Sequence, residues 1–114
     1  MTKISNEYMQ QMLGQAKPYT VVLLSKGPNY DPNGDRGIIW EHGRRNFELR
    51  AAGKLAVVVP MGADDGTSDV VGIGIFVTPP EETQALMAAD PAIVAGWLLA
   101  EVRQGRSFAG DALP

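Results

Sequence analysis

The chain has 114 residues, of which 45% are hydrophobic and 20% are charged, and its ten basic and thirteen acidic side chains give a formal net charge of −3. These values are typical of one globular domain with a core of its own. The sequence contains no cysteine, which excludes disulfides, thiolate nucleophiles and cysteine-ligated metal ions. The lack of a basic stripe argues against nucleic-acid binding. No apolar run is long enough to span a membrane, and the first residues, MTKISNEYMQQ, lack the apolar core of a signal peptide. We therefore expect a cytoplasmic protein with no membrane partner.

The first elements expected along the chain are a short helix and a strand. Residues 4–16 carry apolar side chains at helical spacing, with Ser5 or Asn6 as the N-cap and Pro18 as the stop. We expect this amphipathic helix to lie on the domain or on a partner. Residues 19–26 are apolar and rich in β-branched side chains, which predicts a strand.

A loop dense in glycine, proline, asparagine and aspartate follows at residues 27–37. Asp31, Asn33 and Asp35 have the spacing of the first ligands of a calcium loop. The pattern then fails, because an arginine stands at the position of the turn glycine and a histidine at that of the bidentate glutamate. We therefore interpret these three residues as turn formers.

The next stretch, residues 38–60, predicts a helix, a glycine stop at Gly53 and a strand at 54–59. Helical geometry places six residues on one face, which we expect to pack against the domain: Ile39, Trp40, Gly43, Asn46, Phe47 and Ala51. His42, the only histidine, falls at the edge of that face. An edge position leaves the ring half-covered, with one nitrogen able to reach a cleft. The alternative is a boundary histidine that only fills space.

Residues 61–69 predict a turn, and residues 70–78 predict a third strand. The segment Gly72-Ile73-Gly74 resembles part of a dinucleotide-binding fingerprint. A strand continues where that fingerprint requires a helix to start, so we expect no nucleotide site.

The second main helix is expected to begin at Thr78, which with Glu81 has the spacing of a capping box. It should end at Asp90, because the residue before a proline is pushed out of the helical region. Its expected buried residues are Ala85, Leu86 and Ala89. The remaining expectations are a turn at 92–96, a last strand at 97–103 and an irregular tail at 104–114.

After the first helix, the order of elements is β-α-β-β-α-β, which predicts an α+β, ferredoxin-like fold. Its four strands form an antiparallel sheet with both main helices on one face. The strands at 19–26 and 54–59 are apolar on both faces, so the face away from the helices also needs a cover. We expect a homodimer in which two sheets face each other; the alternative is that the N-terminal helix folds across the open face.

Two segments carry a resemblance to a known family: ELRAAGKL at residues 48–55, after the histidine, and AADPAIVAG at 88–96. With the proline after the second strand, they make residues 19–103 similar to the YciI-like (YCII-related) family of small dimeric α+β-barrel proteins. Residues 1–18 are then an N-terminal helical extension and 104–114 a C-terminal tail. The chain departs from the family in having valine before Pro60, where a Gly-Pro pair is usual, and in its long loop at 27–37.

The resemblance implies a His-Asp pair in a cleft beside the dimer interface, which here is His42 and Asp90. It points to lyase, isomerase or dehydrohalogenase chemistry on small organic molecules without a cofactor. A carboxylate on one ring nitrogen fixes the tautomer, so the other nitrogen can move a proton. Such a pair needs a hydrogen bond of roughly 2.7–3.2 Å. The alternative for Asp90 alone is ordinary turn chemistry before a proline.

Three further residues are candidates for contact with a small organic ligand. Arg36 has the charge to hold a substrate carboxylate, and Trp40 and Trp97 are suited to wall an apolar pocket. One histidine and no cysteine disfavour a transition-metal site. A non-catalytic module that binds a small ligand in the same dimer cleft stays open as the alternative to an enzyme.

Overall fold

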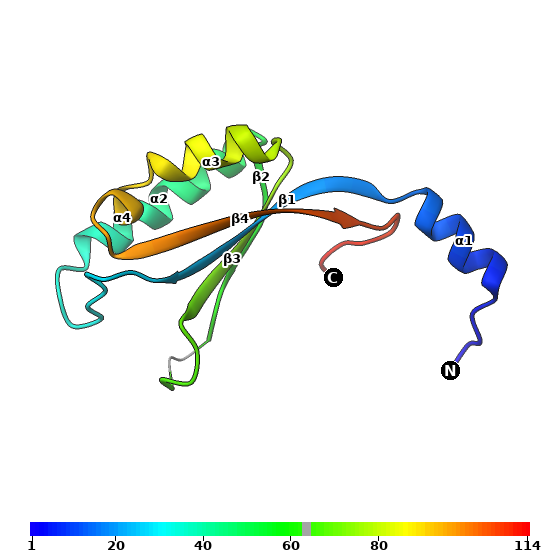
Figure 1. The fold of residues 1–114 in the computed structure, drawn as a ribbon, viewed down its shortest axis with the longest axis horizontal. Helices are drawn as coiled ribbons and strands as arrows, with labels where there is room; N and C mark the ends of the chain where they lie inside the picture. Colours follow the sequence, from blue (N-terminus) through cyan, green and yellow to red (C-terminus); the bar gives the residue numbers. More distant parts are fainter. Residues whose placement is uncertain (63–64) are drawn as a thin grey trace.

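The computed structural model describes residues 1–62 and 65–114 as a four-stranded sheet with helices on one face (Figure 1). In chain order the elements are α1 (Asn6–Gly14), β1 (Lys17–Lys26), α2 (Gly37–Ala51), β2 (Leu55–Pro60), β3 (Val70–Phe76), α3 (Pro80–Ala88), α4 (Pro91–Val94) and β4 (Leu98–Ser107). The strands are ordered β2-β3-β1-β4 and every neighbouring pair is antiparallel. The predicted α+β, ferredoxin-like fold is therefore confirmed. Within the turn expected at 61–69, residues 63–64 lie outside the described part of the chain.

β1 and β4 are both longer than the sequence predicts. They pair from Lys17 with Ser107 to Lys26 with Leu98, whereas β3 joins β1 only from Thr20 onward. The prediction of an irregular tail from residue 104 is therefore wrong for residues 104–107, which continue β4. Each strand supplies the hydrogen-bond partners that extend the other, and this pairing is not visible in either segment alone.

The start of α3 differs from the expected capping box. Pro79 is the N-cap residue and makes no side-chain cap bond. The Thr78 hydroxyl instead lies 2.7 Å from that of Thr83, and the Thr78 carbonyl accepts a 2.7 Å hydrogen bond from Thr20 in β1. These buried hydroxyls tie α3 to the sheet, and so Thr83 faces inward.

The side of α3 that faces the sheet also differs from the expectation. Thr83 and Met87 are buried and Leu86 is half-buried, whereas Ala85 and Ala89 are exposed. Exposing a small alanine side chain to water costs little free energy. The positions of Ala85 and Ala89 therefore do not indicate which side of the helix is packed. Beyond α3, the turn expected at 92–96 is the one-turn helix α4.

The two faces of the sheet have different surroundings. Thr20, Val22 and Leu24 of β1 are buried under α2, α3 and α4. Val21 and Leu23 point to the other face, which no helix of the described chain covers (Figure 1). The core lies between the sheet and the helices, and its buried apolar members are Val22, Leu24, Leu49, Leu55, Phe76, Met87, Ala92, Trp97 and Leu98.

Helix α1 projects beyond the end of the sheet where β1 begins (Figure 1). The Ser5 hydroxyl caps it, accepting a 3.1 Å hydrogen bond from the Tyr8 N–H, as the sequence predicts. None of its residues is buried, so the alternative in which this helix folds across the open face is wrong. The projection gives a radius of gyration of 16.5 Å, against about 13 Å for a compact domain of this length. No helix in residues 1–62 or 65–114 is long and apolar enough to cross a membrane.

Candidate functional site

Helix α2 carries the candidate histidine, and its orientation differs from the prediction. Its buried residues are His42 and Leu49, which are 7% and 8% exposed. Trp40 and Phe47, expected on the packed side, are 69% and 66% exposed. His42 is therefore not at a half-covered edge but under the helix, where a buried ring nitrogen requires a hydrogen-bond partner.

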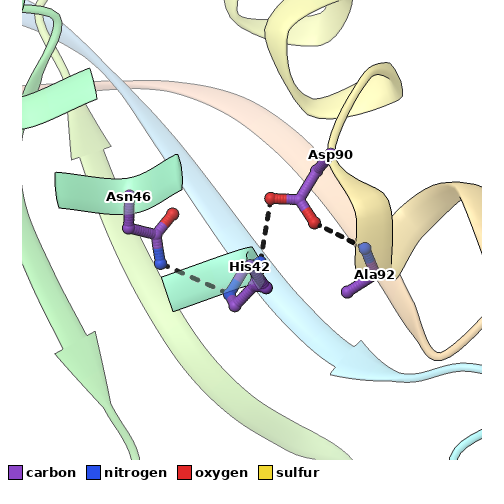
Figure 2. A network of polar contacts seen from close by, with 4 residues as sticks. All are labelled: His42, Asn46, Asp90 and Ala92. Atoms are coloured by element: carbon purple, nitrogen blue, oxygen red, sulfur yellow. Dashed lines mark hydrogen bonds and ion pairs between the residues drawn. The ribbon is translucent and has the colours of Figure 1, made fainter. Parts of the chain in front are cut away.

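Asp90 is that partner. His42 Nδ1 lies 2.8 Å from Asp90 Oδ2, and the Asp90 side chain is completely buried (Figure 2). The hydrogen bond that the sequence led us to expect is therefore present. Because a carboxylate accepts hydrogen bonds, Nδ1 is the ring nitrogen that carries the hydrogen.

The local sequence explains why Asp90 is held so firmly. It is the N-cap residue of α4, in extended conformation before Pro91, and its Oδ1 accepts a 2.8 Å hydrogen bond from the Ala92 N–H. Proline at the first helical position and aspartate at the N-cap are both favoured at helix starts. Each carboxylate oxygen thus has a donor, which offsets the cost of burying the charge.

Asn46 is a third member of this group, although its sequence position predicted only a place on the packed face of α2. It lies one helical turn after His42, and its Nδ2 is 3.3 Å from His42 Nε2 (Figure 2). The signal was present in the sequence, since residues four apart on a helix are neighbours. Both ring nitrogens of His42 are therefore engaged by polar side chains.

A cavity of about 670 Å³ opens beside this group, between α2, the end of β2, the start of β3 and the loop after β1. Its wall includes both His42 and Asn46. Ile39, Gly43 and Phe47 line it too, so most of the predicted apolar stripe of α2 faces this cavity, although Ile39 also packs against the core. A volume of this size suits a small organic molecule.

Two of the three predicted ligand contacts lie at this cavity. Arg36 and Trp97 are in its wall, and the Arg36 guanidinium donates a 3.3 Å hydrogen bond to the Pro32 carbonyl. Trp40 lies outside it, in a shallow surface depression with Pro91. The tryptophan is one position round the helix from Ile39, and that rotation carries its ring to the outer surface.

The loop after β1 closes one side of the cavity and is tied to the junction of α4 and β4. The Gly27 N–H donates to the Trp97 carbonyl at 2.9 Å, and the Asn29 side chain donates to the Ala95 carbonyl at 3.0 Å. A side chain at Gly27 would collide with the Gly96 carbonyl. The Tyr30 ring packs on the Trp97 ring with centroids 4.9 Å apart, which gives the cavity an aromatic wall.

The aspartates of this loop act as turn formers. Asp31 accepts a 3.0 Å hydrogen bond from the Asn33 N–H, and Asp35 accepts one of 2.8 Å from the Gly37 N–H. Across the described ranges, no three histidine, aspartate or glutamate side chains are grouped so as to hold a metal ion.

No protein-family profile matches this chain, and no curated protein sequence matches it. Among solved structures, the chain is similar to 5-chloro-2-hydroxyhydroquinone dehydrochlorinase from Burkholderia phenoliruptrix AC1100, in complex with 2,5-dihydroxybenzoquinone. The two chains are 21% identical, and the match covers 74% of this chain and 90% of that chain with a TM-score of 0.46. The ferredoxin-like assignment follows from this chain's own strand order and connections.

Proposed function

We propose that this protein is a small-molecule enzyme in which His42 transfers a proton and Asp90 orients it. The observation that carries the proposal is the 2.8 Å hydrogen bond from His42 Nδ1 to a buried carboxylate, on a ring that lines a cavity. A histidine that only filled space would not need a buried charge beside it, since burying a carboxylate is costly.

The chemistry follows from the hydrogen bonds. Asp90 accepts from Nδ1–H, so the neutral ring presents the lone pair of Nε2. Nε2 takes a proton from the substrate, and the carboxylate stabilises the imidazolium that forms. The ring then returns the proton to another substrate atom or to a leaving group. This sequence fits the lyase, isomerase or dehydrohalogenase reactions that the YciI-like resemblance implies, and we propose membership of that family.

The cavity wall supports a small organic substrate. The aromatic pair Tyr30 and Trp97 offers an apolar surface, and Arg36 in the same wall offers a cation for an anionic substituent. These residues would position the substrate, while His42 would act on it. Binding and chemistry thus fall to different parts of one wall.

We also propose that the working unit is a homodimer with the open sheet faces together. Val21 and Leu23 of β1 lie beside Ile75 and Ile73 of β3 on that face, and no element of the described chain covers them. An apolar sheet face of this kind is stabilised when it is removed from water. A second copy of the same face supplies a matching surface.

Proton transfer can be tested before the substrate is known. A panel of small cyclic, hydroxylated and halogenated organic acids is incubated with the protein in D2O, and loss of C–H signals is followed by proton NMR. We expect deuterium incorporation into at least one compound, and a loss on the order of 10²–10⁴-fold in His42→Ala. Trp40→Ala is the matched control, because Trp40 lies outside the cavity.

Two outcomes would contradict the enzyme proposal. The first is exchange that His42→Ala leaves unchanged. The second is a compound that binds wild type and His42→Ala equally without exchange, which would indicate a binding module. Thermal melts accompany each variant, and His42→Gln keeps a polar group at the site if the alanine variant unfolds.

A further inference from the structure

Asn46 holds a position that the proposed proton transfer does not yet explain. It is half-buried on the cavity wall, and its Nδ2 lies 3.3 Å from Nε2, the ring nitrogen that would take the proton. A carboxamide is not needed there for the helix, because asparagine is a poor helix former compared with alanine. The contact between Asn46 and His42 is therefore better explained by a role in the site than by helix stability.

The direction of this hydrogen bond follows from the bonds around it. Asp90 accepts from the Ala92 N–H with one oxygen and from His42 with the other. The neutral ring has one N–H, and it is used on Asp90, so Nε2 can only accept. The carboxamide of Asn46 must donate, and its nitrogen faces the ring.

This arrangement means that an Asn46 N–H occupies the lone pair on which the substrate proton must arrive. A substrate has to replace the carboxamide at Nε2. The displaced N–H then lies beside the substrate, and a buried donor left without an acceptor costs roughly 1–3 kcal/mol. The site therefore favours a ligand group that both donates to Nε2 and accepts from Asn46. A hydroxyl group does both with one oxygen atom.

We infer that Asn46 selects substrates that carry a hydroxyl group, which sits between His42 and Asn46 with its O–H on Nε2 and its oxygen on the Asn46 N–H. The inference rests on the proposed function and names its substrate class. The proton passes from oxygen to Nε2, the electron pair of the O–H bond stays on oxygen, and the Nε2 lone pair forms the new N–H bond. The oxyanion then accepts hydrogen bonds from both His42 and Asn46, which stabilises it where it forms.

The rest of the cavity wall determines which kind of molecule can carry this hydroxyl group. Around the polar group the cavity is lined by apolar side chains such as Leu24, Ile39 and Val71, with the Trp97 ring at one side. These surfaces favour an apolar body of ring size. The expected ligand class is therefore a small phenol, enol or cyclic alcohol.

Phenol and toluene test the inference, because they share a shape and differ in the hydroxyl group. Binding is followed by NMR on ¹⁵N-labelled protein, where the single histidine gives one unambiguous pair of ring signals. In wild type we expect phenol to shift both the His42 Nε2 signal and the Asn46 side-chain amide. Toluene should leave the Nε2 signal in place.

Variants of Asn46 complete the comparison. Asn46→Ala should weaken phenol binding by roughly two- to tenfold, the value of one hydrogen bond, and leave toluene binding unchanged. Asn46→Leu, which keeps the volume, should do the same. Glu48→Ala is the matched control, because Glu48 is exposed on the same helix and should leave both affinities unchanged.

The inference is overturned if wild type binds phenol no better than toluene, or if the Asn46 variants weaken both compounds equally. It is also overturned if the ring of the free protein carries its hydrogen on Nε2. None of these readouts requires turnover. A protein that binds phenol through Asn46 but shows no deuterium exchange would keep the inference and reject the enzyme.

Discussion

The two faces of the sheet are built from the same kinds of residue and have opposite surroundings. In β1, Val22 and Leu24 are buried under the helices, and Val21 and Leu23 alternate with them on the open face. The same alternation continues in β3, where Phe76 is buried and its neighbour Ile75 points to the open side. A row of apolar side chains therefore does not by itself show what covers it.

The covered face carries the polar site as well as the core. His42 and Asp90 are buried between α2 and α4, beside the same helices that cover Val22. Burial from water strengthens the electrostatic contact between the ring and the carboxylate. On the open face, beside Leu23 and Val21, Glu101 and Arg103 of β4 form an exposed ion pair. The difference suggests chemistry on one face and association on the other, and the following variants separate them.

The largest effect is expected for Asp90→Asn on the covered face. Asparagine is also a good N-cap, so the bond from the Ala92 N–H and the fold should persist. Its amide would donate to Nδ1 and force the ring hydrogen onto Nε2, which removes the base. We expect proton-transfer activity to fall on the order of 10²–10⁴-fold with little change in the thermal melt. Retained activity in a folded Asp90→Asn protein would contradict the role given to Asp90.

Phe76→Ala and Ile75→Ala compare the two faces at neighbouring positions. Phe76 is 2% exposed, and its truncation should cost about 3–5 kcal/mol of unfolding free energy at every protein concentration. Ile75→Ala should destabilise the protein by an amount that depends on concentration, because the proposed partner of this face is a second copy. Urea unfolding at several concentrations measures both. A concentration-independent loss at Ile75 would argue against the dimer.

A smaller effect is expected at two glycines of β3, both on the covered face. A Cβ at Gly72 would meet Leu24 Cδ1 at 3.6 Å, an ordinary contact, and Gly72 lines the cavity. Gly72→Ala should therefore fold normally and change toluene affinity several-fold. A Cβ at Gly74 would meet Phe76 Cε2 at 3.3 Å and Leu55 Cδ1 at 3.4 Å. Gly74→Ala should lose about 1–3 kcal/mol of stability and bind toluene as wild type does.

The smallest effect lies outside both faces, in the turn after β4. The hydrogen bond from the Phe108 N–H, and then that from the Ser107 hydroxyl, hold the pKa of the Asp111 carboxyl below its usual value of 3.8. The contribution of this turn is fully present above pH 3.8 and is lost as the pH falls through the lowered pKa. The Phe108 amide should lose hydrogen-exchange protection only in that acidic range, and Asp111→Ala should lose it at every pH. Ligand binding should not change in either case.

The fold was predictable because it depends on the order of elements, which short apolar runs and glycine or proline stops define well. The rotation of α2 was not. Its apolar side chains Ile39 and Phe47 form a real stripe, but that stripe lines a cavity, and the buried side is set by a partner 48 residues away. A pattern within one helix cannot report a polar contact of that sequence separation.

The site was predictable in part for the same reason. His42 and Asp90 were found through a resemblance and through the chemistry that pairs them, and their hydrogen bond is present. Trp40 was predicted on the packed face of its helix, but it is 69% exposed and lies outside the cavity. The contact of Asn46 with His42 could have been predicted, since their spacing of four residues is visible in the sequence. An amide on an apolar helix face does not by itself indicate a functional role, because its partner, the ring nitrogen, is not known from the sequence.

The long pairing of β1 with β4 also determines where a fusion partner or a surface tether can be attached. The two strands run together from the cavity, beside Leu24 and Leu98, to a two-stranded ribbon at Lys17 and Ser107, about 30 Å away for a strand of ten residues. Both chain ends leave from that ribbon (Figure 1). A fusion partner or a surface tether at the N-terminal end, where α1 projects away from the sheet (Figure 1), therefore stays clear of the cavity. Immobilised protein should accept soluble compounds as freely as protein in solution.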